Sequence, residues 1–493
     1  MPLATQPVER SLPRTLAFVI GITITAVGVS MLLPVIVSLV YGESRTALAM
    51  VAASLVTVVI GIALWRILGL AGPIGVKEGF ASVGLTWFAL SVFGALPYLF
   101  TGSIPGITDA FFETASGFTT TGASIRANPS DLPKGVLFWR GLTQWVGGMG
   151  VIVLSVAILP LLGTGGMQLA KAEAPGGTPD RLTPRFQETA KRLWLLYLGF
   201  TVLLGVLLLA GDMDWFQAAV HSLTTMSTGG FGTEATSIAE FSSYTKWVIT
   251  AFMFIAGVSF ALHFRALRDP RRYLQNTEFR LYSALTLAAV VLVAGGLLQQ
   301  NPVASVVGDA AFNAVSIITT TGFATADFGG WRPALQILMV GLMFLGGMAG
   351  STAGSVKTFR VGILSKAAFA DLRRLVYPRG VFTLRFGRSR VSDPIIEAIQ
   401  SFFLFYMFLF MTGTFLLTFI DANLTERLDL VTAASAVAAS LGNIGPGLGA
   451  VGPTGNYAAI PDLGKWMLAG FMIVGRLEIF PVLVLFTRDL WRR

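Results

Sequence analysis

The chain has 493 residues, of which 54% are hydrophobic and only 12% are charged, and its mean hydropathy is +0.71. Soluble domains carry about 25% charged residues, so this composition predicts an integral membrane protein. The net charge of +9 is then explained by membrane topology rather than by nucleic acid as a partner. There is no Cys, which excludes disulfides and thiolate metal sites. His221 and His263 alone leave little for a His-based metal centre.

Two long apolar segments, 16–41 and 47–70, open the chain. Each is long enough to span a membrane, which takes about 20 apolar residues. The first is too long for the core of a cleavable signal peptide and is predicted to be retained. Neither segment is followed by a Thr-Gly stretch of the kind described next. We therefore expect residues 1–77 to form an accessory pair of transmembrane helices.

Four units with a common order follow this pair: a long span, a short apolar segment, a stretch centred on Thr-Gly or a related pair, and a second long span. A helix of about 10 residues is roughly 15 Å long and reaches only the middle of a hydrocarbon core about 30 Å thick. The four parts lie at 78–100, 109–119, 120–124 and 136–162 in unit 1 (78–162); at 193–210, 214–226, 227–232 and 245–264 in unit 2 (163–275); at 279–298, 309–318, 319–325 and 333–356 in unit 3 (276–390); and at 399–420, 429–440, 441–447 and 464–487 in unit 4 (391–493). The predicted fold is an all-α integral membrane protein with ten full spans and four half-length pore helices. Its four pseudo-symmetric span–pore helix–span units surround one ion pore.

The four stretches each place a hydroxyl or amide residue, then Thr or Ile, before a Gly. Their backbone carbonyls can replace the hydration shell of a monovalent cation, provided that the loop is extended and lines a protein-walled pore. Gly permits the backbone angles that such a loop needs. A Ca²⁺-type acidic ring is not expected, because the stretches carry no carboxylate; the alternative interpretation is that they are helix-packing positions. The predicted K⁺ filter residues are Thr120, Thr121, Gly122, Ser227, Thr228, Gly229, Thr320, Thr321, Gly322, Asn443, Ile444 and Gly445.

An Asp lies near the expected start of each short segment: Asp109, Asp214, Asp309 and Asp429. Asp is a favoured N-cap and suits the positive end of the helix dipole. The sequence therefore predicts four capped pore helices, whose negative C-terminal ends converge on the stretches and favour a cation there.

The distribution of Lys and Arg predicts the orientation. If the stretches face outward, the cytoplasmic segments carry 26 of the 35 Lys and Arg residues, as the positive-inside rule requires. Both termini are then cytoplasmic. The basic loop 357–390 contributes most, through topology alone or by also contacting an acidic partner or anionic lipid. The expected cytoplasmic segments are 1–14, 66–77, 163–192, 265–280, 357–390 and 488–493.

From about residue 78 to the end, the chain resembles the membrane subunit of Trk-type potassium uptake systems, in the Trk/Ktr/HKT superfamily. The resemblance lies in the four units and in the motifs 119–123, 227–231, 319–323 and 443–447. The N-terminal pair is similar to the bacterial Trk arrangement. The resemblance implies K⁺ transport across a bacterial cytoplasmic membrane by a homodimer, with one pore in each protomer. A cytoplasmic nucleotide-binding ring would gate it, and K⁺ would be the transported ion rather than a cofactor of this chain.

Two further features gain meaning beside this resemblance. Segment 346–357 holds too many Gly residues for a strong helix, and a broken helix at membrane depth must line a cavity or contact other backbone. The resemblance implies that it is the loop that closes the pore, with Arg476 of the last span lying near the pore below the filter. The alternatives are a Gly-rich helix crossing and, for Arg476, an ion pair with Glu478 or Glu113. The predicted gate residues are Gly346, Gly347, Gly350, Ser351, Thr352, Gly354, Ser355, Lys357 and Arg476.

Other functions remain open at this stage. A Na⁺ or non-selective cation transporter is one, although in the plant branch of the superfamily Na⁺ selectivity is associated with Ser in place of the first filter Gly, and Gly122 is intact. A symporter that couples the cation to H⁺ or Na⁺ is another. A transporter of organic solutes does not need four half-length helices. A membrane enzyme would need acid–base or nucleophilic groups at depth, whereas His263 is expected at a cytoplasmic edge and His221 in a packing role.

Overall fold

The computed structural model describes residues 12–68, 76–158, 182–298, 303–380, 382–387, 389–424 and 428–491. Parts of the expected cytoplasmic segments, namely 1–11, 69–75, 163–181 and 492–493, lie outside the described residues. The described part is almost entirely helical, and a single two-stranded hairpin is its only sheet. The first helices are α1 (Leu12–Ser30), α2 (Leu32–Val40), α3 (Ser44–Leu68), α4 (Val76–Gly94) and α5 (Leu96–Thr101).

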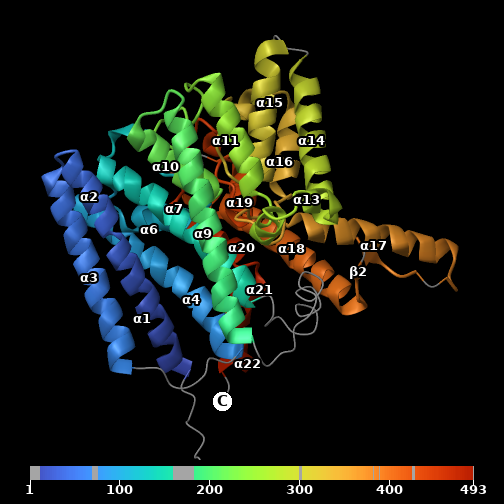
Figure 1. The fold of residues 1–493 in the computed structure, drawn as a ribbon, viewed down its shortest axis with the longest axis horizontal. Helices are drawn as coiled ribbons and strands as arrows, with labels where there is room; N and C mark the ends of the chain where they lie inside the picture. The colour runs from blue at the N-terminus through green and yellow to red at the C-terminus, as the bar shows by residue number, and fades with distance from the viewer. Residues whose placement is uncertain are drawn as a thin grey trace, which may run out of the picture.

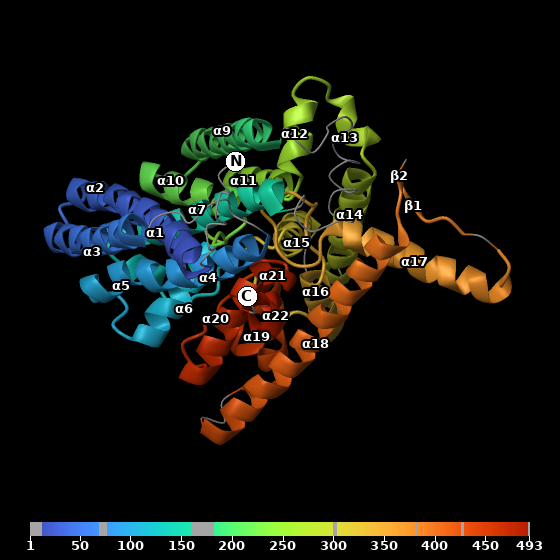
Figure 2. The ribbon, with the colours of Figure 1, turned by 90° about the horizontal axis from the view of Figure 1, so that it is seen from below.

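The N-terminal helices form one edge of the molecule, with α1 and α3 packed side by side (Figures 1 and 2). Small residues allow this close approach: a Cβ added at Gly21 would lie 2.8 Å from the Gly61 carbonyl oxygen, and one added at Gly61 would lie 2.2 Å from Thr25 Oγ1. Such contacts between small residues are typical of helix pairs in membranes.

The four short apolar segments are all helices, as expected. They are α6 (Ile107–Phe118), α10 (Trp215–Met226), α15 (Val303–Ile318) and α19 (Leu430–Gly442). In three of the four units a short 3₁₀ turn lies between the stretch and the next helix: η1 (Pro129–Asp131), η3 (Phe328–Gly330) and η4 (Gly449–Val451). The longer helices beside the pore helices are α7 (Lys134–Ile158), α9 (Leu182–Leu209), α14 (Thr277–Leu297) and α18 (Asp393–Leu424).

Three of the expected full spans are not continuous helices; the break at 346–357 was expected from its glycines, whereas the breaks in the other two spans were not. Span 245–264 divides into α11 (Ser243–Ala256) and α12 (Phe260–Ala266), bent by 99°. Span 464–487 divides into α20 (Asp462–Arg476) and, after a bend of 118°, α21 (Phe480–Leu483) and η5 (Val484–Phe486). Span 333–356 ends as helix α16 (Pro333–Met343) after 11 residues. The described residues contain six helices long and apolar enough to cross a membrane, or up to eight if each bent pair counts as one.

Close backbone packing explains the breaks. A Cβ added at Gly475 would lie 1.9 Å from the Leu441 carbonyl oxygen, and one added at Gly347 would lie 2.6 Å from the Gly257 carbonyl oxygen. At these points the backbone of one span lies in contact with the backbone of a neighbour. Such contact requires glycine, and a regular helix is not maintained there.

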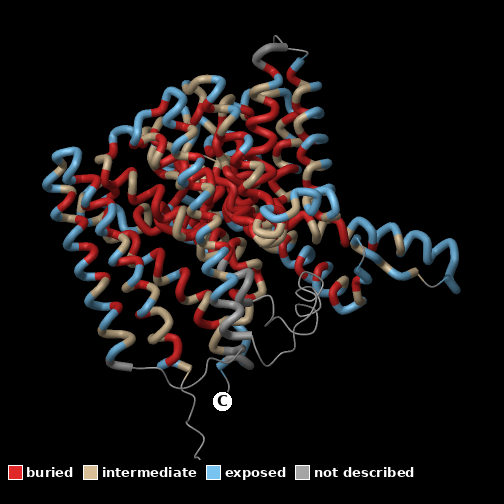
Figure 3. Tube along the Cα trace, viewed as in Figure 1, coloured by how far each residue is buried: buried red, intermediate tan, exposed pale blue. Residues whose placement is uncertain are grey.

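The remaining elements lie beside the four units: α13 (Arg271–Gln275), α17 (Thr358–Val376), the strands β1 (Arg385–Phe386) and β2 (Ser389–Arg390), and α22 (Arg488–Trp491). Helix α17 projects from the body as an arm, and the hairpin lies at its base (Figures 1 and 2). By contrast, buried residues concentrate in the middle of the molecule, where the pore helices end (Figure 3). The fold therefore places the four stretches at its centre.

Candidate ion pathway

Each of the four pore helices ends in the same backbone arrangement. The amides of Thr120 and Thr121 donate to the carbonyls of Gly117 and Ser116, both at 2.9 Å. This pair of bonds is a Schellman motif, which closes a helix with one residue in the left-handed conformation. Equivalent pairs close the other three helices, with Thr228 and Gly229, Thr320 and Thr321, and Asn443 and Ile444 as the donors.

The left-handed residue is not glycine in any of the four stretches. Thr120, Thr228, Thr320 and Asn443 have φ values of 53°, 53°, 56° and 54°. A β-branched Thr is a backbone outlier at such angles, and outliers of this kind cost about 1–3 kcal/mol each. Asn is one of the few residues that tolerate this conformation. The departure of the fourth stretch from Thr is therefore compatible with the same backbone.

Two residues further on, each stretch has a glycine with positive φ: Gly122 (81°), Gly230 (79°), Gly322 (86°) and Gly445 (102°). This corrects the register expected from the sequence in the second stretch, where Ser227, Thr228 and Gly229 were placed in line with Thr120, Thr121 and Gly122. The structure places Thr228, Gly229 and Gly230 there. Two adjacent glycines made the sequence ambiguous, and only the backbone angles resolve it.

Each of the four glycines lies against a backbone carbonyl of the next stretch, and the four contacts form a closed circle. A Cβ added to Gly122 would lie 2.2 Å from the Gly229 oxygen, one on Gly230 would lie 2.0 Å from the Thr321 oxygen, one on Gly322 would lie 2.0 Å from the Ile444 oxygen, and one on Gly445 would lie 2.7 Å from the Thr121 oxygen. Any side chain would therefore push the next stretch away. A further bond closes the circle between the last and first stretches, where Asn443 Nδ2 donates to Thr121 Oγ1 at 3.0 Å.

A hollow of about 90 Å³ lies on one side of this circle. All four of these glycines line it, together with residues that follow the stretches, among them Ser124, Arg126 and Glu234. Gly229 does not line it, which agrees with the corrected register. The hollow therefore opens onto the circle from one side.

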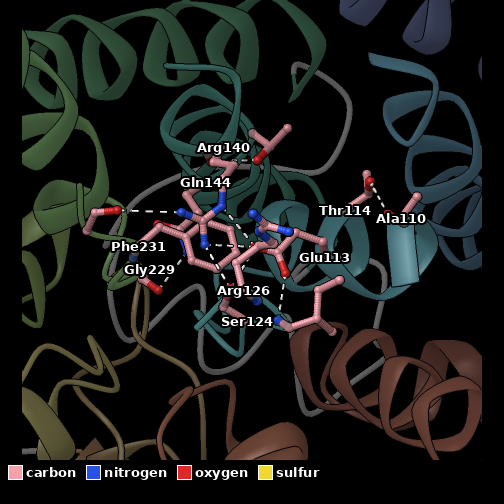
Figure 4. A network of polar contacts seen from close by, with 12 residues as sticks. Ala110, Glu113, Thr114, Ser124, Arg126, Arg140, Gln144, Gly229 and Phe231 are labelled. Carbon is pink, nitrogen blue, oxygen red and sulfur yellow. Dashed lines mark hydrogen bonds and ion pairs between the residues drawn. The ribbon is translucent and has the colours of Figure 1, made fainter. Parts of the chain in front are cut away.

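A buried polar network supports the first two stretches (Figure 4). Arg140 of α7 pairs with Glu113 of α6 at 2.7 Å, and both side chains are almost fully buried. The Glu113 carboxylate also accepts from Ser124 Oγ and from the Ile125 amide, each at 3.0 Å. Arg140 lies over the Phe231 ring at 4.1 Å. The pair therefore holds the segment after the first stretch against the segment after the second.

Gln144, one turn further along α7, bonds the second stretch on both sides of Gly230. Its Nε2 donates to the Gly229 oxygen at 2.7 Å, and its Oε1 accepts from the Phe231 amide at 3.1 Å. Sequence reasoning missed Arg140 and Gln144 and considered Glu113 only as a partner for Arg476. A polar stripe at positions 140 and 144, spaced one helical turn apart in an apolar helix, was the signal that could have revealed them.

The four Asp residues have different roles. Asp214 caps α10 in a capping box with Gln217, and Asp429 caps α19 by accepting from the Thr432 amide at 2.8 Å. The expectation was wrong for the other two. Helix α6 begins at Ile107, before Asp109, whose carboxylate instead pairs with the buried Lys465 of α20 at 2.6 Å. Helix α15 begins at Val303, and the carboxylate of Asp309 accepts from Thr325 Oγ1 at 2.8 Å.

The Gly-rich segment 346–357 is a buried, non-helical loop, as expected for a broken helix, and we call it the intramembrane loop. A single parallel β-bridge between Leu345 and Val356 joins its two ends. The Gly354 amide donates to Thr320 Oγ1 at 2.6 Å, and a Cβ added to Gly354 would lie 2.3 Å from the Gly442 oxygen. Thr352 Oγ1 lies 3.2 Å from the Met226 oxygen. The loop therefore contacts the C-terminal ends of three pore helices. The hollow, by contrast, is lined by the four glycines and by residues that follow them.

Arg476 is buried at the end of α20 and donates from Nη1 to the Thr352 oxygen of the intramembrane loop at 2.6 Å. Neither residue that was considered as an ion-pair partner of Arg476 pairs with it. Glu113 pairs with Arg140, and Glu478 pairs with Arg360. Its Nε and Nη2 have no hydrogen-bond partner among the described residues. Within the loop, the Lys357 ammonium donates to the Ala353 oxygen.

The two histidines contact protein groups. His221 lies in α10 between the rings of Phe241 and Phe323, with Nδ1 2.8 Å from the Gln217 oxygen. His263 lies in α12 and contacts the Ile255 oxygen and the Tyr273 hydroxyl. The packing role expected for His221 agrees with these contacts.

The structure is a bundle of apolar helices with a central circle of loop glycines, and a short helix leads into each of the four loops. This architecture is that of a membrane transport protein. The TrkH family, described as "Cation transport protein", matches residues 48–492, and the chain belongs to this family.

Similar proteins cover nearly the whole chain. The Trk system potassium uptake protein TrkH of Escherichia coli (strain K12) is 38% identical over 97% of this chain and 99% of its own length. TrkG of the same organism is 31% identical over the same shares. The crystal structure of the potassium transporter TrkH from Vibrio parahaemolyticus has a TM-score of 0.88 at 35% identity and covers 97% of this chain and 99% of its own.

Proposed function

We propose that this protein takes up K⁺ across the bacterial cytoplasmic membrane through the circle of four stretches. One observation carries the proposal: four segments far apart in the chain adopt the same backbone, with a non-glycine residue at positive φ, and meet glycine to carbonyl. Strain that recurs in this way is expected where function requires it. The relatives are named as potassium uptake proteins, which supports K⁺ as the ion.

In this proposal the carbonyls of the stretches replace the hydration shell of the ion. The filter comprises the residues predicted from the sequence, with Gly230 added as the counterpart of Gly122. The four units are then pseudo-symmetric repeats around one pore, within the boundaries 78–162, 163–275, 276–390 and 391–493, and residues 1–77 are accessory.

The intramembrane loop acts as the gate below the filter. Its contacts with Thr320 and Arg476 support a position in the path of an ion that leaves the circle. Arg476 places a positive charge beside the loop, and such a charge disfavours cations nearby. The remaining gate residues predicted from the sequence, from Gly346 to Lys357, belong to the same loop.

On this proposal both termini are cytoplasmic, as the distribution of Lys and Arg indicates. The chain assembles as a homodimer and is controlled by a cytoplasmic nucleotide-binding ring. The projecting helix α17 supports a protein partner on that side, because Phe369, Leu372 and Leu375 are more than half exposed there. Large apolar side chains that remain exposed together mark interaction sites.

Uptake of ⁸⁶Rb⁺ into liposomes that contain the purified protein, with Na⁺ as competitor, tests the ion. We expect Rb⁺ uptake above that of protein-free liposomes and weak competition by Na⁺. Equal permeation of Rb⁺ and Na⁺ would favour the alternative, a Na⁺ or non-selective transporter. Dependence of the uptake on an imposed H⁺ or Na⁺ gradient would indicate a symporter.

A further inference from the structure

The break between α11 and α12 carries an unusual set of hydrogen bonds. A helix that ends leaves carbonyl groups without partners, and at membrane depth each unsatisfied group costs several kcal/mol. At this break the carbonyls of Phe254, Ile255, Ala256 and Gly257 all accept from groups outside α11. All four carbonyls at the broken end therefore accept a hydrogen bond from neighbouring groups.

Two of these four donors belong to the intramembrane loop. The Met348 amide donates to the Gly257 oxygen at 2.8 Å. Thr352 Oγ1 lies 3.3 Å from the Ala256 oxygen and shares its single proton between this group and the Met226 oxygen. On the other side of the break, the Phe260 amide at the start of α12 donates to the Gly350 oxygen at 3.0 Å. The loop thus bonds both helix ends, and its displacement would leave buried polar groups on each without partners.

The other two donors come from helices α12 and α14. Tyr282 of α14 donates its hydroxyl to the Phe254 oxygen at 3.1 Å. His263 Nε2 lies 2.9 Å from the Ile255 oxygen, and Nδ1 lies 2.7 Å from the Tyr273 hydroxyl of α13. Because a carbonyl only accepts, the Nε2 proton is fixed and, in the neutral ring, Nδ1 accepts from Tyr273.

Helix α14 also bonds the loop directly. Glu278, in the first turn of α14, is buried, and its Oε1 accepts from the Ala349 amide at 2.7 Å. Ala349 lies between the two loop residues, Met348 and Gly350, that bond the break. Hydrogen bonds to charged acceptors are about twice as strong as neutral ones, so the Glu278 carboxylate is a strong attachment point for this part of the loop.

We propose that the α11–α12 break and Glu278 together form the seat that holds the intramembrane loop closed, with Glu278 as its positioning residue. The inference rests on the proposed function, in which this loop is the gate. Its consequence is that segment 257–280, which contains α12, α13 and the start of α14, transmits movement on the cytoplasmic side to the gate. A partner that displaced this segment would release the loop without touching it.

Two substitutions at Glu278 test the seat. Glu278→Ala removes the acceptor, and we expect about tenfold faster hydrogen exchange at residues 347–352 with faster ⁸⁶Rb⁺ uptake and an unchanged ratio of Rb⁺ to Na⁺ uptake. Glu278→Gln keeps an acceptor oxygen and should bring both rates to within about threefold of the parent. Glu397→Ala removes an exposed carboxylate from α18 and serves as the matched control with parental rates.

The outcomes are separable. Unchanged exchange at 347–352 in Glu278→Ala, or equal exchange in the Ala and Gln variants, overturns the seat. Slower Rb⁺ uptake in folded Glu278→Ala also overturns it, since loosening a closed gate must raise flux. If the parent protein gives no uptake above protein-free liposomes, the proposed function fails, while hydrogen exchange still decides whether Glu278 holds the loop.

Discussion

The amide nitrogen of Gly354 in the intramembrane loop lies 2.6 Å from the side-chain hydroxyl of Thr320 in the third stretch. Both residues are buried, so this bond is shielded from water. It joins two parts of the molecule that the proposal assigns to gate and filter. The loop and the stretch cannot move far apart unless this amide loses its acceptor or finds another.

Replacing Thr320 with Val removes that acceptor while keeping a β-branched shape. An orphaned buried donor costs about 1–3 kcal/mol, so the loop should detach more readily and ⁸⁶Rb⁺ flux should rise about tenfold. Thr120→Val is the matched control, because Thr120 has the same backbone position and its hydroxyl has no partner among the described residues. Equal hydrogen exchange of the loop in the two variants would show that the Gly354–Thr320 bond does not hold it.

The corrected register predicts which glycine of the second stretch is essential. Gly230→Ser should reduce the preference for Rb⁺ over Na⁺ as strongly as Gly122→Ser, by about tenfold or more, because either side chain would meet a carbonyl of the next stretch within 2.2 Å. Gly229 has a neighbour that can yield, the side chain of Gln144, so Gly229→Ser should have the smaller effect. Competition between Rb⁺ and Na⁺ in liposomes measures all three. A larger loss in Gly229→Ser would contradict the register.

Arg476→Ala removes the charge beside the intramembrane loop and its bond to the Thr352 oxygen. Both changes favour an open pathway, and we expect a several-fold higher basal Rb⁺ flux, since one charge-assisted bond contributes about 1.5–3 kcal/mol. Arg476→Lys retains the charge and should give an intermediate flux. A lower flux from folded Arg476→Ala protein would instead assign the residue to structure alone.

The buried Glu113–Arg140 pair should matter mainly for stability. Removing one partner leaves an uncompensated buried charge, which costs about 3–5 kcal/mol, so Glu113→Gln and Arg140→Gln should each lower the unfolding temperature in detergent. The double variant leaves no unpaired charge and should recover part of the loss. Thermal unfolding followed by size-exclusion chromatography measures this coupling, and strictly additive losses would show that the pair is not coupled.

Hydropathy and composition were enough to predict a helical membrane protein, because the bilayer requires long apolar helices irrespective of how they pack. The short length of 109–119 and its counterparts likewise predicted four helices too short to cross. Segment 346–357 was predicted to break its helix because glycine is locally unfavourable there. Each of these properties depends on residues close together in the chain.

Contacts between distant residues decided the rest. Gly230 rather than Gly229 faces Thr321, 91 positions later. The local sequence does not show which of the two adjacent glycines takes this place. Asp109 was expected to cap a helix, but pairs with Lys465, which only folding brings near. The breaks in the second spans of units 2 and 4 also depend on folding, because close approach to other backbone makes their non-helical conformations favourable. The sequence by itself determined which segments are helical and apolar, whereas the tertiary structure decided their register, partners and breaks, since these depend on which backbones meet.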